Sequence, residues 1–91
     1  MAIKVRIPAP LRRSTGGVSE VELVASEVAS LIQQLEERFP GVSKRLRDEK
    51  GNLYRFVNIF VNGEDVRFLD GLATKVKDGD EVSIVPAVAG G

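Results

Sequence analysis

The feature that most constrains the fold is a single amphipathic helix, which we predict between Ser26 and Phe39. Ser26 is a good N-cap residue, and Glu27 places a negative charge in the first turn, where the helix dipole favours it. Apolar residues then recur at helical spacing and form one stripe: Val28, Leu31, Ile32, Leu35 and Phe39. Pro40-Gly41 stops the helix. Such a helix must bury its stripe against one apolar face of a sheet.

Two segments of alternating polarity before this helix predict a β-hairpin. The first ends at Pro8, because proline cannot donate a hydrogen bond to a strand ladder. The second runs from Val18 to Val24, and Leu11 to Gly17 is predicted as the loop between them. The side chains expected in the core are Ile3, Val5, Ile7, Val21 and Leu23.

Three further strands are predicted after the helix. The strongest spans Tyr54 to Val61, which is rich in aromatic and β-branched residues, and Asn62-Gly63 ends it with a turn. A short strand follows over residues 66–68. The turn Asp78-Gly79-Asp80 then leads into a final strand from Glu81 to Val85, with Val82 and Ile84 expected to face the core.

The strand from Tyr54 to Val61 has two apolar faces. We assign Val57, Ile59 and Val61 to the core, which leaves Phe56 and Phe60 on the opposite face. That placement is unusual for a small domain. Either a loop covers these two aromatic rings, or they form an exposed patch for a partner.

The segment from Val42 to Lys50 is less clear, because it carries a run of charges. Val42 and Leu46 could form one helical turn. A solvated loop or short helix is the simpler interpretation, and a charged docking surface is the alternative.

Together the elements predict one α+β domain, in which a mixed sheet packs on a single main helix. If the first and last strands run parallel at the centre of the sheet, the fold is a β-grasp. We place the domain at residues 1–85 and a flexible tail at residues 86–91.

Composition excludes several kinds of function. The chain has no cysteine and no histidine, so disulfides, thiolate chemistry and the commonest general base and zinc ligand are absent. Thirteen basic and 13 acidic residues cancel, which argues against a general nucleic-acid or membrane binder. With no apolar run of transmembrane length and no hydrophobic leader, we expect a cytoplasmic protein. A small hydrolase is disfavoured by this inventory of side chains.

The last six residues, from Pro86 to Gly91, contain no charged, hydroxyl-bearing or long side chain. Gly90 and Gly91 lack a Cβ, so the end can enter a narrow slot. The segment reaches at most about 20 Å. We hypothesise that the Gly91 carboxylate is the working group and enters a partner's active site. An inert end is the simpler alternative, because termini often carry small residues by chance.

Over essentially the whole domain, the chain resembles the MoaD/ThiS family of ubiquitin-like sulfur carriers. The segments that carry the resemblance are Arg55 to Asn62, Glu64 to Phe68, Gly71 to Thr74, Asp78 to Asp80 and Pro86 to Gly91. Thr15-Gly16-Gly17 also fits the CysO branch, which supplies sulfur for cysteine biosynthesis. The resemblance implies a β-grasp fold and a C-terminal thiocarboxylate.

The resemblance also implies how such a carrier works. An E1-like enzyme would adenylate the Gly91 carboxylate with ATP, and a sulfur donor would displace AMP to leave a thiocarboxylate. An acceptor such as a pyridoxal-phosphate cysteine synthase would then take the sulfur. The carrier itself would be no enzyme and would bind no cofactor; ATP, pyridoxal phosphate and metals would belong to its partners.

By the same resemblance, Gly91 carries the chemistry together with Gly90, and an apolar patch near the root of the tail docks the partners. We expect Phe60 and Val85 in this patch, with Val88 and Phe56 beside them. Three alternatives remain open: a carrier for the molybdopterin or thiazole pathway, a ubiquitin-like modifier conjugated through Gly91, and a binding module whose tail is inert.

Overall fold

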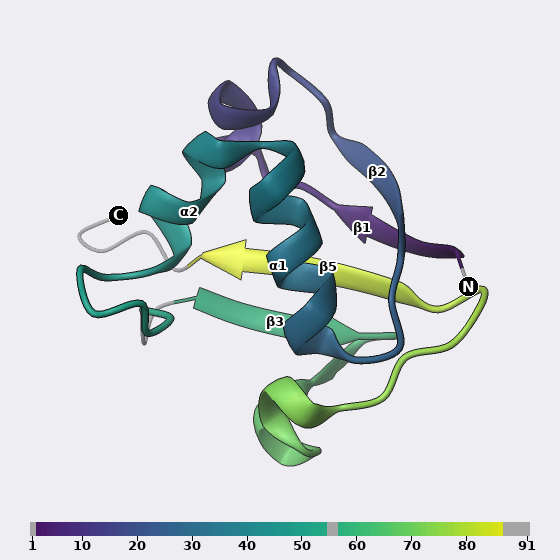
Figure 1. Cartoon of the computed structure of the whole chain (residues 1–91). Helices are drawn as coiled ribbons and strands as arrows, with labels where there is room; N and C mark the ends of the chain where they lie inside the picture. Colours follow the sequence, from purple (N-terminus) through teal and green to yellow (C-terminus); the bar gives the residue numbers. More distant parts are fainter. Residues whose placement is uncertain (1, 55–56, 87–91) are drawn as a thin grey trace.

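A five-stranded mixed sheet organises the chain, with strand order β2-β1-β5-β3-β4 (Figure 1). The computed structural model describes residues 2–54 and 57–86. The strands are β1 (Ala2–Arg6), β2 (Glu20–Val24), β3 (Val57–Val61), β4 (Glu64–Asp65) and β5 (Glu81–Pro86). β1 and β5 run parallel at the centre, and the other neighbouring pairs are antiparallel. This arrangement confirms the predicted β-grasp.

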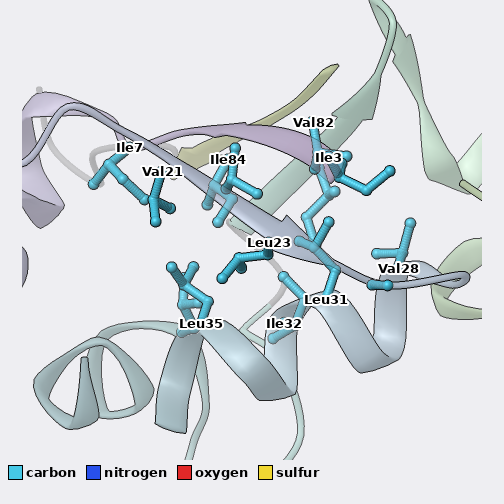
Figure 2. Close-up of a cluster of buried hydrophobic side chains, with 14 of the residues drawn as sticks. Ile3, Ile7, Val21, Leu23, Val28, Leu31, Ile32, Leu35, Val82 and Ile84 are labelled. Atoms are coloured by element: carbon cyan, nitrogen blue, oxygen red, sulfur yellow. The ribbon is translucent and has the colours of Figure 1, made fainter. Parts of the chain in front are cut away.

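Two α-helices lie on one face of the sheet, α1 (Val28–Arg38) and α2 (Pro40–Leu46) (Figure 1). The predicted stripe of α1 is buried, and Phe39 at its end is partly buried. Figure 2 shows α1 side chains gathered with those of β1, β2 and β5. The central side chains of this core are Ile3, Leu23, Leu31, Ile32, Leu35, Val82 and Ile84. The predicted facing of every core residue in β1, β2 and β5 is therefore confirmed.

The start of α1 differs from the prediction by one residue. Its N-cap is Glu27 rather than Ser26. Glu27 keeps an extended backbone because it forms an isolated β-bridge with Lys75, and the two side chains also form an ion pair of 2.7 Å. The amide of Val28 donates to the carbonyl of Thr74 at 3.0 Å. A contact distant in the sequence thus sets this helix boundary.

Pro40 ends α1 as predicted, but it also begins α2. Proline suits the first helical turn, because its missing N–H would have no partner there. Val42 and Leu46 lie in α2 and are fully buried, so the short-helix interpretation is correct for this segment as far as Leu46. The charge run that follows is partly structural, because Nε of Arg47 lies 2.7 Å from Oε2 of Glu36 on α1.

Two other segments predicted without helices form 3-10 helices. The loop expected from Leu11 to Gly17 is mostly the helix η1 (Ala9–Thr15), which buries Leu11 against the core. The strand expected at residues 66–68 is the helix η2 (Val66–Phe68), and the ladder ends in β4 just before it. The chain turns there because the side chain of Asp65 accepts a hydrogen bond of 2.9 Å from the amide of Arg67. A further 3-10 helix, η3 (Gly71–Ala73), follows.

The strand predicted from Tyr54 is shorter at its start. Tyr54 lies outside β3, and its amide donates to the carbonyl of Leu46 at 2.9 Å. Leu53 forms an isolated bridge with Arg47 instead. Residues 55 and 56 are outside the described residues.

Candidate functional site

The face of the sheet opposite α1, here called the open face, carries two of the four predicted docking residues, Phe60 and Val85. Alternation along β3 buries Val57, Ile59 and Val61 and turns Phe60 outward, as predicted. Phe60 is half-buried there, whereas Val85 on β5 keeps 44% of its surface exposed. The sequence therefore predicted correctly which face each residue occupies; their role in binding a partner remains a prediction.

The strand register brings these two residues close together. Phe60 pairs with Ser83, and Val85 pairs with Asn58, on the neighbouring strands β3 and β5. Phe60 and Val85 are thus diagonal neighbours, a spacing within reach of an aromatic side chain. They form a small apolar patch on the open face.

The root of the tail lies next to this patch. β5 extends through Pro86, which pairs with Val57. Phe56, Val88, Gly90 and Gly91 lie outside the described residues, so their predicted roles stay predictions. A groove of about 350 Å³ lies beside Val85 and includes Arg6 and Pro8 among its lining residues, at the C-terminal ends of the two parallel strands.

A polar network that the sequence reasoning missed borders the patch on the β4 side. Asp65 pairs with Phe60 across the ladder, and its carboxylate is largely buried beneath Arg67. Nη2 of Arg67 lies 2.7 Å from Oδ2 of Asp65 and 2.5 Å from Oδ1 of Asn58. The hydrogen bonds from Arg67 hold the pKa of Asp65 below its usual range, and the carboxylate in turn raises the pKa of the guanidinium. The available signal was an acidic residue two positions before an arginine, after a predicted turn.

A second arginine borders the patch on the β1 side. Arg6 pairs with Ser83, the residue that also pairs with Phe60. Nε of Arg6 lies 2.8 Å from Oε1 of Glu81. The patch therefore lies between two arginines, each held by a carboxylate.

The turns at the far end of β3 and β5 fix the register that assembles this site. The Asn62-Gly63 turn is confirmed, with φ of +50° and +88°. Nδ2 of Asn62 donates to Oδ1 of Asp80 at 3.0 Å, and Oδ1 of Asn62 accepts from the amide of Glu81 at 3.0 Å. The hydrogen bond from the side-chain amide of Asn62 lowers the pKa of the Asp80 carboxyl. The same carboxylate also accepts a hydrogen bond from the backbone N–H of Lys77.

In the part of the chain that the structure describes, no group of three or more acidic residues is placed to hold a metal ion. Within residues 2–54 and 57–86, no helix is long and apolar enough to cross a bilayer.

A sequence model of the ThiS family matches residues 5–91. The chain belongs to this family. It is 50% identical over 93 residues to the sulfur carrier protein CysO of Mycobacterium tuberculosis, and the match covers 100% of both chains. The ThiS-family assignment and this full-length likeness make the chain a sulfur carrier protein rather than an enzyme.

Two further relatives show which other kinds of protein this ThiS-family chain resembles. The crystal structure of a BexX/CysO complex from Amycolatopsis orientalis contains a chain with a TM-score of 0.88 and 49% identity, covering 99% of this chain and 100% of that one. Small archaeal modifier protein 3 of Haloferax volcanii is 37% identical over 93 residues, with 100% of both chains covered. The likeness thus extends to carriers and to modifiers.

Proposed function

We propose that the Gly91 carboxylate is adenylated by an E1-like enzyme and converted to a thiocarboxylate, and that the sulfur enters cysteine biosynthesis. The full-length likeness to CysO carries this proposal, because it extends through the final glycines. A carboxylate at neutral pH is a poor electrophile. Activation is therefore needed before sulfur can be attached.

The proposed chemistry is two successive displacements. A carboxylate oxygen of Gly91 attacks the α-phosphorus of ATP, which forms the acyl adenylate and releases pyrophosphate. Sulfide then attacks the acyl carbon, a C–S bond forms, and the bond to AMP breaks. The resulting thiocarboxylate is a nucleophile tethered to the carrier, and a pyridoxal-phosphate cysteine synthase holding an activated serine derivative is the proposed acceptor.

In this proposal the carrier contributes the tail and a docking surface. Phe60 and Val85 supply apolar contact beside the root of the tail, with Phe56 and Val88 as further members outside the described residues. The presence of a CysO chain in the BexX complex supports the idea that this fold presents its surface to a second protein. ATP, pyridoxal phosphate and metals would be held by partner enzymes.

Intact-mass measurement tests the proposal directly. The carrier is incubated with the adenylating enzyme of its own organism, ATP and sulfide, and we expect the mass increase of one oxygen-to-sulfur exchange. A variant lacking Gly91 should melt at the same temperature and gain no sulfur, and a reaction without ATP should also gain none. The proposal would be refuted if the mass stayed unchanged in the complete reaction while the same enzyme preparation activated another carrier.

The acceptor is tested separately. The thiocarboxylate form is mixed with the pyridoxal-phosphate enzyme and activated serine, and we expect a carrier extended by one cysteine at Gly91. If sulfur were transferred only to a molybdopterin or thiazole precursor, the assignment to cysteine biosynthesis would be wrong while the carrier chemistry would stand.

The second candidate function is protein modification through Gly91, which the likeness to small archaeal modifier protein 3 favours. After tryptic digestion, a modifier would leave a remnant of residues 78–91 on lysines of other proteins, because Lys77 is the last lysine or arginine before Gly91. Such remnants that depend on Gly91 would establish this second function, and their absence under conditions where the thiocarboxylate accumulates would exclude it.

A further inference from the structure

We propose that Arg6 and Arg67 are a pair of flanking arginines that recognise acidic side chains on the adenylating enzyme, one on each side of the apolar patch. This inference deepens the proposed function and rests on it. It concerns which groups the enzyme must present, and it adds two polar residues to a docking surface otherwise described by apolar ones.

The register of the sheet places the two arginines on opposite sides of the same patch. Arg6, Ser83 and Phe60 form one row across β1, β5 and β3, and Asp65 on β4 continues that row. Neighbouring strands lie about 4.8 Å apart, so the row from Arg6 on β1 to Asp65 on β4, which holds Arg67, spans roughly 14 Å. That distance admits one apolar side chain of a partner between two polar contacts.

Both arginines belong to the open face. Arg6 alternates with Val5 and Ile7, which are buried under the helices, so its side chain points away from them. Arg67 reaches the same face because its guanidinium contacts Asn58, which alternates with the buried Val57 and Ile59.

Each guanidinium is oriented before any partner arrives. Arg67 donates through Nε and Nη2 to the carboxylate of Asp65 and through Nη2 to Asn58. Arg6 is held by Glu81. A side chain already fixed in one geometry loses less conformational entropy on binding, which favours its use as an interface contact.

The two groups nevertheless remain open to a partner. The side chains of Arg67 and Arg6 keep 63% and 58% of their surface exposed. A guanidinium carries five N–H donors, and within the described part of the chain Nη1 of Arg67 makes no hydrogen bond. The pair formed by Arg6 and Glu81 is exposed on both sides and adds little to folding stability, so folding alone gives weak reason to place that arginine here.

The complementary partner surface is an apolar side chain flanked by two carboxylates. Arginine is enriched in the energetically important parts of protein interfaces, and a bidentate carboxylate matches its planar fork. The enzyme that must bring Gly91 to ATP has to bind the body of the carrier beside the tail root, which is where the two arginines lie.

Adenylation kinetics test this inference. The variants are Arg6→Ala, Arg67→Ala and the double variant, and Arg45→Ala is the matched control because Arg45 is an exposed arginine on α2. With the adenylating enzyme of the same organism, pyrophosphate release should show KM raised about threefold to tenfold by each single variant and about thirtyfold by the double variant, with kcat unchanged. Arg45→Ala should match the wild type.

Salt dependence and direct binding make the result decisive. Raising ionic strength from about 0.05 M to about 0.5 M should weaken wild-type binding, measured by titration without ATP, and should affect the double variant much less. Equal affinity and equal salt dependence for the double variant and the wild type would overturn the inference. A wild type that binds through the arginines but is never adenylated would overturn the proposed function instead, and a wild type that does not bind would overturn both.

Discussion

Two adjacent residues on β5 allow a test of whether one face of the sheet stabilises the fold while the other binds a partner. Ile84 is 1% exposed and packs in the core, whereas Val85 is 44% exposed on the open face. Replacing each by alanine makes the same kind of truncation on opposite faces of one strand. We expect the first variant to lose stability and the second to lose affinity for the adenylating enzyme.

The magnitudes follow from burial. Ile84→Ala should cost about 2–5 kcal/mol in free energy of unfolding, which lowers Tm by roughly 10–30 °C in a domain of this size. Val85→Ala removes two carbons worth about 0.8 kcal/mol each when fully buried. Because 44% of Val85 is still exposed, about 0.7 kcal/mol is left for a partner to gain, which corresponds to roughly a threefold rise in KM.

Thermal melting by circular dichroism and pyrophosphate release by the adenylating enzyme measure the two effects. Ile84→Ala should keep its KM at a temperature where it is folded, because a domain of this length has roughly 5–14 kcal/mol of stability to lose. A Val85→Ala variant that melts lower than Ile84→Ala, or that is adenylated with the wild-type KM, would refute this division of the strand.

Two further predictions concern the turns that hold β3 against β5. Gly63→Ala should lower Tm by about 4–8 °C, because φ is +88° at this position. Gly41→Ala on α2 is the control and should be tolerated, since its new Cβ would meet Ser14 only at ordinary contact distance. A Gly63 variant as stable as the Gly41 variant would contradict the turn assignment. The folded-state pKa of Asp80 is lowered from 3.8, so its contribution is present above about pH 4 and is lost as pH falls through the folded pKa. Urea midpoints between about pH 5 and pH 2 should therefore fall less steeply for Asp80→Asn than for the wild type, and equal slopes would show that Asn62 does not stabilise the Asp80 carboxylate.

Patterns of alternating polarity predicted most of the fold, because β1, β2, β3 and β5 each bury one face in the hydrophobic core. The facing of Ile3 and Val5 on β1 and of Val57 and Ile59 on β3 needed only a period of two. From that facing, the open-face position of Phe60 followed without any knowledge of its neighbours.

What the sequence did not predict depends on contacts between distant or turning segments. Glu27 stays extended because Lys75 pairs with it, and no local signal near Ser26 contains that information. The side chain of Asp65 accepts a hydrogen bond from the amide of Arg67 and turns the chain into η2, so residues 66–68 do not form the predicted strand. The same turn places Arg67 beside the patch. Sequence reasoning therefore found the apolar part of the candidate site and missed its polar border.

The pairing of β1 with β5 has a consequence for how the protein is made. On the ribosome, the first strand emerges early but must wait for almost the entire domain before its central neighbour is synthesised. A nascent chain interrupted before Glu81 would lack β5, the strand that lies between β1 and β3. If the adenylating enzyme binds the sheet surface as proposed, it would therefore also exclude unfinished carriers.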